Sequence, residues 1–382
     1  MSDLSIAIVG AGMGGLAAAA TLRGVGITVD VYEQAERFER VGAGIQMMPN
    51  SMKVLRDIGV EEDIKASSFK PYSHLNRAWD TGEVLRELPM PEDLFGAPYL
   101  CMHRADLIAA LAHRIPSESV HFGKKLKGLG QKADRVTLDF EDGSEVVADA
   151  VIGADGVHSL TREIIVGPDQ PIHKGRIAYR SVYSTDRLNG RDIGPSRTKW
   201  WGTDRHIVIY YVTDSRSEIY FVTSVPEPAD WVTPESWSAK GDVEEVRAAY
   251  EGFHEDVRAV LDACPVCHKW AILEREPLPK WSDGRVALLG DACHPMTPYM
   301  AQGAAQAIED AAILARCLEA ESNVEQAFAR YEAHRKPRTS RIQAISSANT
   351  WMQGGEQDTS WLYGYDAWNV PLDKPGSVGT AD

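Results

Sequence analysis

The pattern of hydrophobic positions at the N-terminus predicts a strand, a helix and a second strand. Residues 6–9 form a continuous apolar run, which is typical of a parallel strand buried on both faces. The alanine-rich segment 16–22 favours a helix, and residues 28–32 form a second strand that ends at Glu33. This order predicts a βαβ unit with Glu33 at the tip of its second strand.

The same kind of pattern predicts further elements. Asn50 has the position of an N-cap for an amphipathic helix that ends at Gly59. Residues 103–115 predict another amphipathic helix. The Glu-Asp-Gly turn at 141–143 lies between two alternating segments and predicts a β-hairpin.

The pattern changes after about residue 171. Segments 176–184, 199–213 and 218–225 are rich in aromatic and β-branched residues, which favours strands of an antiparallel sheet. The buried-strand pattern returns at 286–289, a long helix is predicted over 301–318, and a further helical segment is predicted over 324–335. The middle sheet is therefore expected to be inserted into a discontinuous first domain.

Composition and charge narrow the class of protein. The chain has 382 residues and a formal net charge of −15, which argues against a nucleic-acid-binding surface. Residues 4–22 carry no charge, but four glycines at regular spacing interrupt the stretch and Asp3 precedes it. We therefore expect a cytoplasmic protein that makes no membrane contact.

The five cysteines predict free thiols rather than a disulfide framework, because their number is odd and no export signal is evident. Cys264-Pro-Val-Cys267-His268 matches the pattern for covalent haem attachment. A zinc site is a second alternative, although no second ligand pair lies at finger-like spacing. A structural role is favoured for this segment, and no metal ligand is expected in the chain.

Gly10, Gly12 and Gly15 form a G-x-G-x-x-G fingerprint between a strand and a helix. The first glycine allows the tight turn, the second lets the backbone approach a pyrophosphate, and the third lets helix and strand pack closely. The helix N-terminus offers free N–H groups and partial positive charge to the phosphates. Glu33 lies at the usual distance for an acid that binds ribose hydroxyls.

A second apolar strand ends in Gly290-Asp291 and is followed by a helix. The Asp291 carboxylate can accept hydrogen bonds from the polyol chain of a flavin dinucleotide, or it can simply cap a helix. Arg104 can neutralise a pyrophosphate, or it can be a solvated arginine at a helix start. Together with the N-terminal fingerprint, this second cofactor-binding motif indicates a flavin rather than a nicotinamide cofactor that binds transiently.

These motifs resemble those of the single-component FAD-dependent aromatic hydroxylases, the p-hydroxybenzoate and salicylate hydroxylase group. The resemblance extends over nearly the whole chain. Beyond the fingerprint and Glu33, it rests on Gly42-Ala-Gly44-Ile45-Gln46 with Pro49-Asn50, on Arg104, on Asp155-Gly156, on Gly290-Asp291 and on Pro295-Met-Thr-Pro298-Tyr-Met-Ala-Gln-Gly303.

The resemblance implies a tightly bound FAD, a transient NADH or NADPH, and O2 as co-substrate. The implied cofactor-binding residues are Gly10, Gly12, Gly14, Gly15, Glu33, Gln34, Gln46, Arg104, Leu126, Asp155, Asp291, Pro298, Gly303 and Ala304.

Within this group the chain is most similar to the 6-hydroxynicotinate 3-monooxygenases. Segments around Trp200-Trp201, Tyr210-Tyr211, Asn349-Thr-Trp351 and Tyr363-Gly-Tyr365-Asp366 carry that similarity. Those enzymes have histidine where this chain has Gln46 and Tyr299. Glutamine cannot act as a base near neutral pH, so the substrate need not be the same.

His206, Tyr210 and Tyr299 are the predicted catalytic residues. Alternation along a strand puts His206, Val208 and Tyr210 on one face. On spacing alone these are ordinary sheet residues, but the family resemblance favours a substrate site. His206 is expected to titrate near neutrality and to take or relay a phenolic proton, while Tyr210 bonds the same oxygen. Tyr299 is expected to approach the substrate from the opposite side.

The resemblance implies a monooxygenase that hydroxylates a small hydroxylated aromatic acid, such as 6-hydroxynicotinate or a hydroxybenzoate, through a flavin C4a-hydroperoxide. Carbon dioxide is lost if the carboxylate sits on the attacked carbon. One alternative is a flavin-dependent dehydrogenase or reductase without oxygen insertion. Another is a flavin-binding regulatory or electron-carrying protein, linked to haem through Cys264 and Cys267. A monomer or homodimer is expected.

The predicted fold class is α/β, with a discontinuous Rossmann-like FAD-binding domain, an inserted antiparallel β-sheet substrate domain and C-terminal helices. The predicted bounds are 1–70, 99–170 and 271–320 for the FAD-binding domain, 71–98 and 171–270 for the substrate domain, 321–370 for a C-terminal helical segment and 371–382 for a flexible tail.

Overall fold

The computed structural model describes residues 4–40, 42–227, 239–349, 351 and 358–373. Residues 374–382 of the predicted tail lie outside these ranges.

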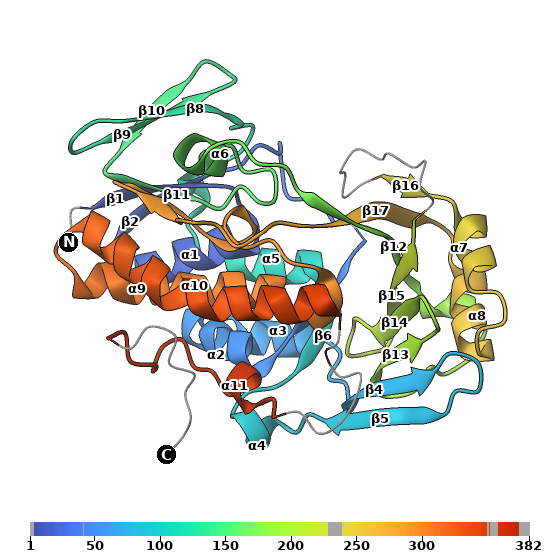
Figure 1. The fold of residues 1–382 in the computed structure, drawn as a ribbon. Helices are drawn as coiled ribbons and strands as arrows, with labels where there is room; N and C mark the ends of the chain where they lie inside the picture. The colour runs from blue at the N-terminus through green and yellow to red at the C-terminus, as the bar shows by residue number, and fades with distance from the viewer. Residues whose placement is uncertain (1–3, 41, 228–238, 350, 352–357, 374–382) are drawn as a thin grey trace.

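A six-stranded sheet joins segments that are far apart in the sequence (Figure 1). Its order is β18 (Ser282–Asp283), β19 (Val286–Leu288), β11 (Ala150–Gly153), β1 (Ser5–Val9), β2 (Thr28–Tyr32) and β7 (Val120–His121). All neighbours are parallel except β18, which pairs antiparallel with β19. Because parallel strands end at the same edge, the loops after β1, β2, β11 and β19 meet there.

Helices cover this sheet. α1 (Met13–Gly24) packs against α9 (Gly303–Ala320), and α10 (Val324–Ala348) lies along α9 (Figure 1). The shorter helices are α2 (Pro49–Ile58), α3 (Glu61–Ser67), α4 (Glu92–Phe95), α5 (Arg104–Ala112), α6 (Leu160–Val166) and α11 (Ser360–Tyr363). Two small sheets complete this part: β8 (Leu126–Gln131), β9 (Val136–Phe140) and β10 (Glu145–Ala148), and the pair β3 (Gly44–Met47) and β6 (Leu100–His103).

An eight-stranded sheet forms the second part of the molecule. Its order is β16 (Lys240–Gly241), β17 (Cys267–Glu274), β12 (Ile172–Ser184), β15 (Glu218–Pro226), β14 (His206–Tyr211), β13 (Arg197–Trp201), β4 (Ser73–Ala78) and β5 (Val84–Pro89). Only the β13–β4 pair is parallel. α7 (Val243–Ala249) and α8 (Glu255–Ala263) lie along one side of it (Figure 1). Along β14, Ile207, Ile209 and Tyr211 alternate with His206, Val208 and Tyr210, so the two sets face opposite sides of the sheet.

The structure confirms the predicted fold class, with a discontinuous parallel sheet and an inserted, mainly antiparallel one. The hairpin at 141–143 is also confirmed, since it joins β9 to β10. Asn50 is not an N-cap, and this prediction was wrong. α2 begins at Pro49, because proline needs no N–H partner in the first turn, and Asn50 turns inward.

α10 continues to Ala348, well beyond the predicted end at Arg335, although Pro337 lies inside it. Proline removes one backbone hydrogen bond from a helix interior. Arg335 and Arg338, on either side of Pro337, both bind Glu309 of α9, which holds the two halves of α10 against α9. Among the described residues, no helix is long and apolar enough to cross a membrane.

Candidate active site

The glycine loop after β1 is built for close approach. A Cβ at Gly10, which has φ +103°, would lie 2.4 Å from the Ala154 carbonyl oxygen, and a Cβ at Gly15 would lie 2.0 Å from the Gly10 oxygen. A Cβ at Gly12 would meet nothing within 4 Å. The chain therefore needs Gly10 and Gly15 for its own packing, whereas Gly12 keeps the space above the N-terminus of α1 open.

The N-terminus of α1 suits a pyrophosphate. Its first turn contains no acidic residue, and no side chain caps it. The unpaired N–H groups and the helix dipole therefore favour an anion. Gly14 differs from its neighbours, because its Cβ would lie 2.7 Å from the Leu289 side chain, so Gly14 lets α1 pack closely on the segment after β19.

Glu33 lies at the tip of β2, as predicted, and it also organises the loop. Its Oε2 accepts a hydrogen bond of 2.8 Å from the Ala11 N–H, and its Oε1 accepts one of 2.8 Å from the Ala35 N–H. Gln34 is exposed beside it. Leu126 is buried at the start of β8, two residues after Lys124, whose N–H donates to the Glu33 carbonyl.

Asp155 follows β11 and holds its own loop together. It accepts hydrogen bonds from the Ser159 hydroxyl and from the N–H and hydroxyl of Thr161, both of the latter at 3.0 Å. The buried Arg162 then donates to the Ala292 carbonyl at 3.3 Å. This arginine therefore links the loop of Asp155 to the loop of Asp291, although the two aspartates are 136 positions apart in the sequence.

Asp291 and Arg104 meet at the same edge. Asp291 is accessible, yet the surrounding protein raises the pKa of its carboxyl, which His294 and Arg104 oppose. Burial lowers the pKa of Arg104, and the charges of Asp291 and Glu33 counteract that. An accessible carboxylate close to a desolvated arginine fits the polyol and phosphate parts of one long cofactor.

The N-terminus of α9 reaches this edge. A Cβ at Gly303 would lie 3.8 Å from Asp291 Oδ1, and no acidic residue stands in the first turn of the helix. Ala304 is partly buried and Pro298 is exposed near the helix start. Asp291 and the N-terminus of α9 therefore lie together at the edge of the sheet where the parallel strands end.

A buried polar network holds α9 in place from behind. Its members are Asn50, His294, Gln302, Gln306, Glu309, Asp310, Arg335 and Arg338. Arg335 is wholly buried and pairs with Glu309 at 2.7 Å and with Asp310 at 2.6 Å. Burial would raise the pKa of Glu309, but Arg338 and Arg335 lower it. Sequence patterns did not reveal this network.

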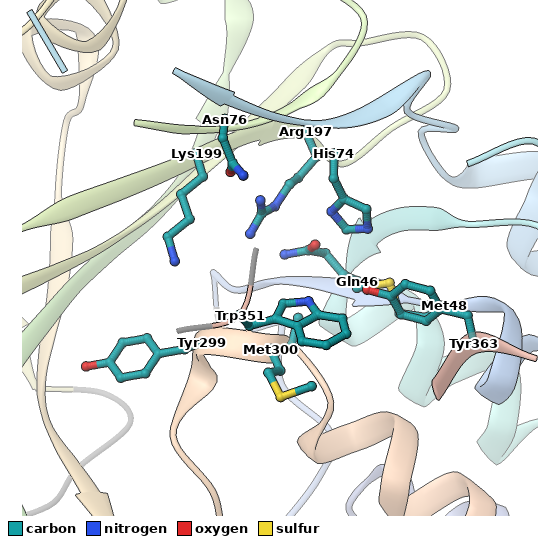
Figure 2. A pocket seen from close by; sticks show the side chains of 11 residues that line it. Gln46, Met48, His74, Asn76, Arg197, Lys199, Tyr299, Met300, Trp351 and Tyr363 are labelled. Atoms are coloured by element: carbon teal, nitrogen blue, oxygen red, sulfur yellow. The ribbon is translucent and has the colours of Figure 1, made fainter. Parts of the chain in front are cut away.

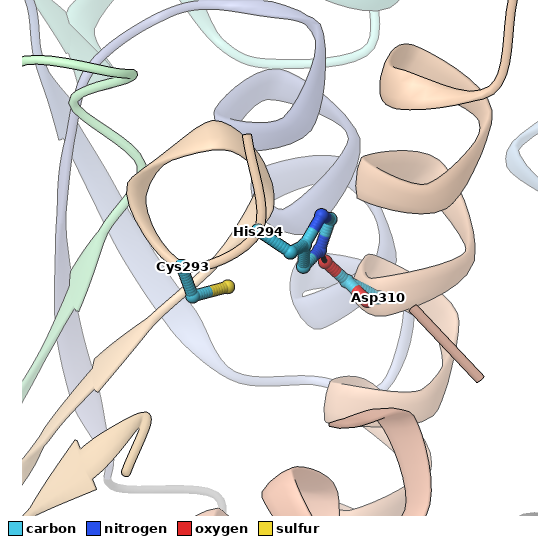
Figure 3. Close-up of side chains that lie close together, drawn as sticks. All are labelled: Cys293, His294 and Asp310. Atoms are coloured by element: carbon cyan, nitrogen blue, oxygen red, sulfur yellow. Dashed lines mark hydrogen bonds and ion pairs between the residues drawn. The ribbon is translucent and has the colours of Figure 1, made fainter. Parts of the chain in front are cut away.

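Cys293, His294 and Asp310 come close enough to resemble a metal site (Figure 3). The two Asp310 oxygens, however, already accept from Arg335 Nε and His294 Nε2. Burial also raises the pKa of the Cys293 thiol well above its ordinary value. The cluster is therefore part of the buried polar network and does not fit a metal ion.

Cys264 and Cys267 are both buried among apolar side chains of the second core, and burial raises the pKa of each thiol. Neither sulfur is accessible to a haem vinyl group, so this geometry argues against the haem-linked alternative.

A pocket lies between the eight-stranded sheet and the segment before α9 (Figure 2). It is lined by Gln46, Met48, His74, Asn76, Arg197, Lys199, Tyr299, Met300, Ala301, Trp351 and Tyr363. In Figure 2 the four polar residues of β4 and β13 point from the sheet toward the aromatic and methionine side chains opposite. One wall is therefore cationic and polar, and the other is aromatic and apolar.

The three predicted catalytic residues lie differently with respect to this pocket. Tyr299 lines it, and its hydroxyl is 3.2 Å from the Ser224 hydroxyl. His206 packs edge-on against Tyr299 at 5.5 Å between ring centroids, without lining the pocket. Tyr210 is buried beside Tyr220 and reaches the pocket only through Gln46, which also accepts from the Tyr99 hydroxyl at 2.7 Å.

His206 does not titrate near neutrality as expected. Burial holds its pKa well below the ordinary value, and the charges of Lys199, Arg176 and Arg197 lower it further. His206 is therefore a neutral imidazole at physiological pH and does not carry the second ring proton there.

The cations of the pocket were missed from the sequence. Arg197 and Lys199 are 7% and 4% exposed, and within the described ranges neither forms an ion pair with a carboxylate. In β13 they alternate with Thr198, so both face the pocket beside His74 and Asn76 of the parallel neighbour β4. The available signal was a pair of cations two positions apart in a buried, aromatic-rich strand.

Residues 3–346 match the family described as FAD binding domain. The chain belongs to this FAD-binding family. It is 46% identical over 376 residues to 6-hydroxynicotinate 3-monooxygenase of Pseudomonas fluorescens, with 97% of each chain covered. It is 37% identical over 344 residues to 3-amino-4-hydroxybenzoate 2-monooxygenase of Streptomyces cremeus, with 89% of this chain and 85% of that relative covered.

Solved structures give the same relationship. HpxO of Klebsiella pneumoniae, complexed with FAD and uric acid, matches with a TM-score of 0.81 at 27% identity, over 91% of this chain and 87% of HpxO. A salicylate hydroxylase substrate complex matches with a TM-score of 0.81 at 26% identity, over 96% of each chain. The protein is an FAD-dependent aromatic monooxygenase that uses NAD(P)H and O2.

Proposed function

We propose that the substrate is a small aromatic carboxylate with a ring hydroxyl, of the hydroxybenzoate or hydroxypyridine carboxylate class. One observation carries this proposal: the buried guanidinium of Arg197 faces a pocket with aromatic walls beside the amine of Lys199, and neither group has an acidic partner among the described residues. Burying a charge without a partner costs several kcal/mol, on the order of the penalty for one desolvated ion. An anionic aromatic ligand removes that cost and fills the remaining apolar surface.

Arg197 is the proposed carboxylate ligand. Its guanidinium is permanently charged and suits a bidentate contact with a planar carboxylate, and its Nε has no partner among the described atoms. Trp351 and Met300 lie across the pocket and offer apolar surface to the ring. The substrate is thereby held at one end by charge and along its faces by packing.

Gln46 and Tyr210 are proposed to position the ring next to the cofactor. Tyr99 donates to Gln46, and Tyr210 is hydrogen-bonded to the same amide, so the Gln46 side chain is held in one orientation. Tyr210 is therefore a positioning residue. Tyr299, which reaches the pocket itself, is the proposed contact on the opposite side, and His206 supports its ring.

The cofactor-binding assignments are proposed as a set: Gly10, Gly12, Gly15 and Glu33 for the pyrophosphate and ribose, Arg104 for the pyrophosphate, Asp291 for the polyol and the N-terminus of α9 for the ring. FAD held by these residues would supply the chemistry of hydride acceptance from NAD(P)H and of O2 activation. The protein supplies orientation and a pocket that excludes bulk water.

The proposal also covers the cellular location, the oligomeric state and the domain division. We place the protein in the reducing cytoplasm, because all five cysteines are free and buried. We also propose that it is a monomer or homodimer. The proposed domain division follows the two large sheets: 1–70, 99–170 and 271–320 around FAD, 71–98 and 171–270 around the substrate, and 321–370 behind α9.

A substrate screen tests the proposal. Hydroxybenzoates and hydroxypyridine carboxylates are incubated with holoenzyme and NADH or NADPH, and products are measured by mass. We expect one compound to gain an oxygen, or to exchange its carboxyl for hydroxyl. Arg197→Met should raise KM for it about 100-fold, which corresponds to about 2.7 kcal/mol. Lys125→Met, which removes an exposed cation paired with Glu141, is the matched control and should leave KM unchanged.

The proposal fails if every acid of this class stimulates only peroxide-forming NAD(P)H oxidation. It also fails if Arg197→Met binds the acid as tightly as the unmodified enzyme does, because the charge would then play no part.

A further inference from the structure

Lys199 differs from Arg197 in that its charge is not fixed. Its side chain runs from β13 into the pocket, and its Nζ lies 3.6 Å from the centroid of the Trp201 ring and 6.0 Å from that of Tyr299 (Figure 2). Within the part of the chain that the structure describes, no hydrogen bond joins this amine to a carboxylate. The amine is thus a buried donor that faces the substrate position.

Among the residues that the structure describes, the groups around Lys199 are cationic or neutral. β13 contributes Arg197, β12 contributes Arg176, β14 contributes the neutral His206, β4 contributes the neutral His74, and the loop before α9 contributes Tyr299. Burial, followed by Arg197 and Arg176, holds the pKa of Lys199 well below its ordinary value. The neutral amine is therefore favoured until an anion enters the pocket.

We propose that Lys199 accepts the proton of the substrate's ring hydroxyl as the substrate binds, and so holds the substrate as its phenolate; this rests on the hydroxylated aromatic acid proposed above. The O–H bond of the substrate breaks and an N–H bond forms on Nζ. The pair changes from amine and phenol to ammonium and phenolate, with no proton exchanged with solvent. An ionised ring oxygen makes the adjacent ring carbons electron-rich, as hydroxylation requires.

The neighbouring residues are poorer acceptors. Arg197 is protonated already and cannot take a proton. Burial holds the pKa of His206 well below its ordinary value, which makes His206 a weak base, and His206 does not line the pocket. Arg197 and Lys199 are two positions apart on one face of β13, about 6.6 Å along the strand. That separation lets one aromatic ring present its carboxylate to Arg197 and its hydroxyl to Lys199.

The experiment uses 4-hydroxy-3-nitrobenzoate as the probe, because its phenolate absorbs visible light and its phenol does not. Difference spectra are recorded with FAD-loaded enzyme, at a pH where most of the free probe is protonated. Bound to the unmodified enzyme, the probe should absorb as the phenolate. Bound to Lys199→Met it should absorb as the phenol, with an ionised-to-neutral ratio at least about tenfold lower. Lys125→Met is the control and should match the unmodified enzyme.

Proton release separates an acceptor from a fixed charge. With a pH indicator in weak buffer, the unmodified enzyme should release no net proton when the protonated probe binds. Lys199→Arg keeps a cation that cannot accept a proton, so it should still bind the phenolate but release one proton per probe. Flavin content and the unfolding midpoint of each variant are measured first, so that misfolding is recognised.

Several results would overturn the inference. One proton released by the unmodified enzyme means that Lys199 is an ammonium before binding. An unchanged phenolate spectrum in Lys199→Met, with full flavin content, means that another group stabilises the anion. These outcomes leave the proposed function intact if the substrate screen yields a hydroxylated acid. If the unmodified enzyme neither binds the probe nor hydroxylates any acid of the class, both proposals fail.

Discussion

Replacing Arg335 by methionine is the sharpest test of what holds the flavin-facing helix in place. Arg335 is wholly buried and pairs with Glu309 at 2.7 Å and with Asp310 at 2.6 Å. It also donates to the carbonyl and side-chain oxygens of Gln306. Methionine of similar length removes these contacts without opening a large cavity, but it leaves two buried carboxylates with less compensation.

The expected loss of unfolding free energy is about 3–5 kcal/mol, the cost of removing one partner of a buried ion pair. Arg338 still neutralises Glu309, so Asp310 bears most of the loss. The matched control is Arg330→Met on the same helix. Arg330 pairs with Glu321 at 2.8 Å, but the two side chains are 31% and 27% exposed, so the loss should stay below about 1 kcal/mol.

Urea titrations of both variants, followed by circular dichroism and by flavin release, measure these differences. Because Gln306 is bonded to Gln302 just before the α9 N-terminus, Arg335→Met should also weaken FAD binding, whereas Arg330→Met should not. Equal stability of the two variants would refute the reasoning, since burial would then make no difference to the value of the ion pair.

Three further predictions follow from the cofactor groove and the same network. Gly12→Ala should keep the stability of the apo-protein within about 0.5 kcal/mol but lower FAD affinity, because the new methyl projects into open space. Gly15→Ala should instead destabilise the fold itself. Flavin titration and thermal unfolding of the two variants measure these effects. Asp291→Asn should lower flavin content after gel filtration while the far-UV spectrum is unchanged; full retention of FAD would remove Asp291 from the polyol site. The pKa values of Glu309 and Asp310 are lowered in the folded state. The two carboxylates therefore stabilise the fold at neutral pH, and this contribution is lost as pH falls below their ordinary pKa values of 4.5 and 3.8. An acid unfolding midpoint that is the same in Arg335→Met would contradict this.

Local patterns in the sequence predicted the parts of the fold that local chemistry determines. The apolar run of β1, the glycine turn and the αL stop at Gly59 each depend on a few adjacent residues. The meeting of the loops after β1, β2, β11 and β19 was also accessible to prediction, because parallel strands bring their C-terminal ends together whatever lies between them. Asn50 was misassigned because the capping pattern is local, while its partner Glu309 lies 259 positions away.

The substrate pocket was harder to predict because it depends on pairing between distant strands. The parallel contact of β13 with β4 sets Arg197 beside His74 and Lys199 beside Asn76. Nothing in either strand indicates that partner. The alternation around His206 correctly gave the face of β14, but not how completely the neighbouring cations and burial would suppress its protonation.

The buried basic residues behind α9 and those of the pocket differ in whether the chain supplies acidic partners. Arg335 and Arg338, behind α9, are matched by Glu309 and Asp310, so the chain supplies the compensating charge wherever the role is structural. On the substrate side the Arg197 guanidinium is also buried, yet the described chain supplies no acid to it or to the neighbouring Lys199 amine. A protein that pairs one set of buried arginines with acids and leaves the Arg197 guanidinium unpaired favours binding of an external anion there. The missing charge is therefore the strongest physical argument that the substrate is acidic.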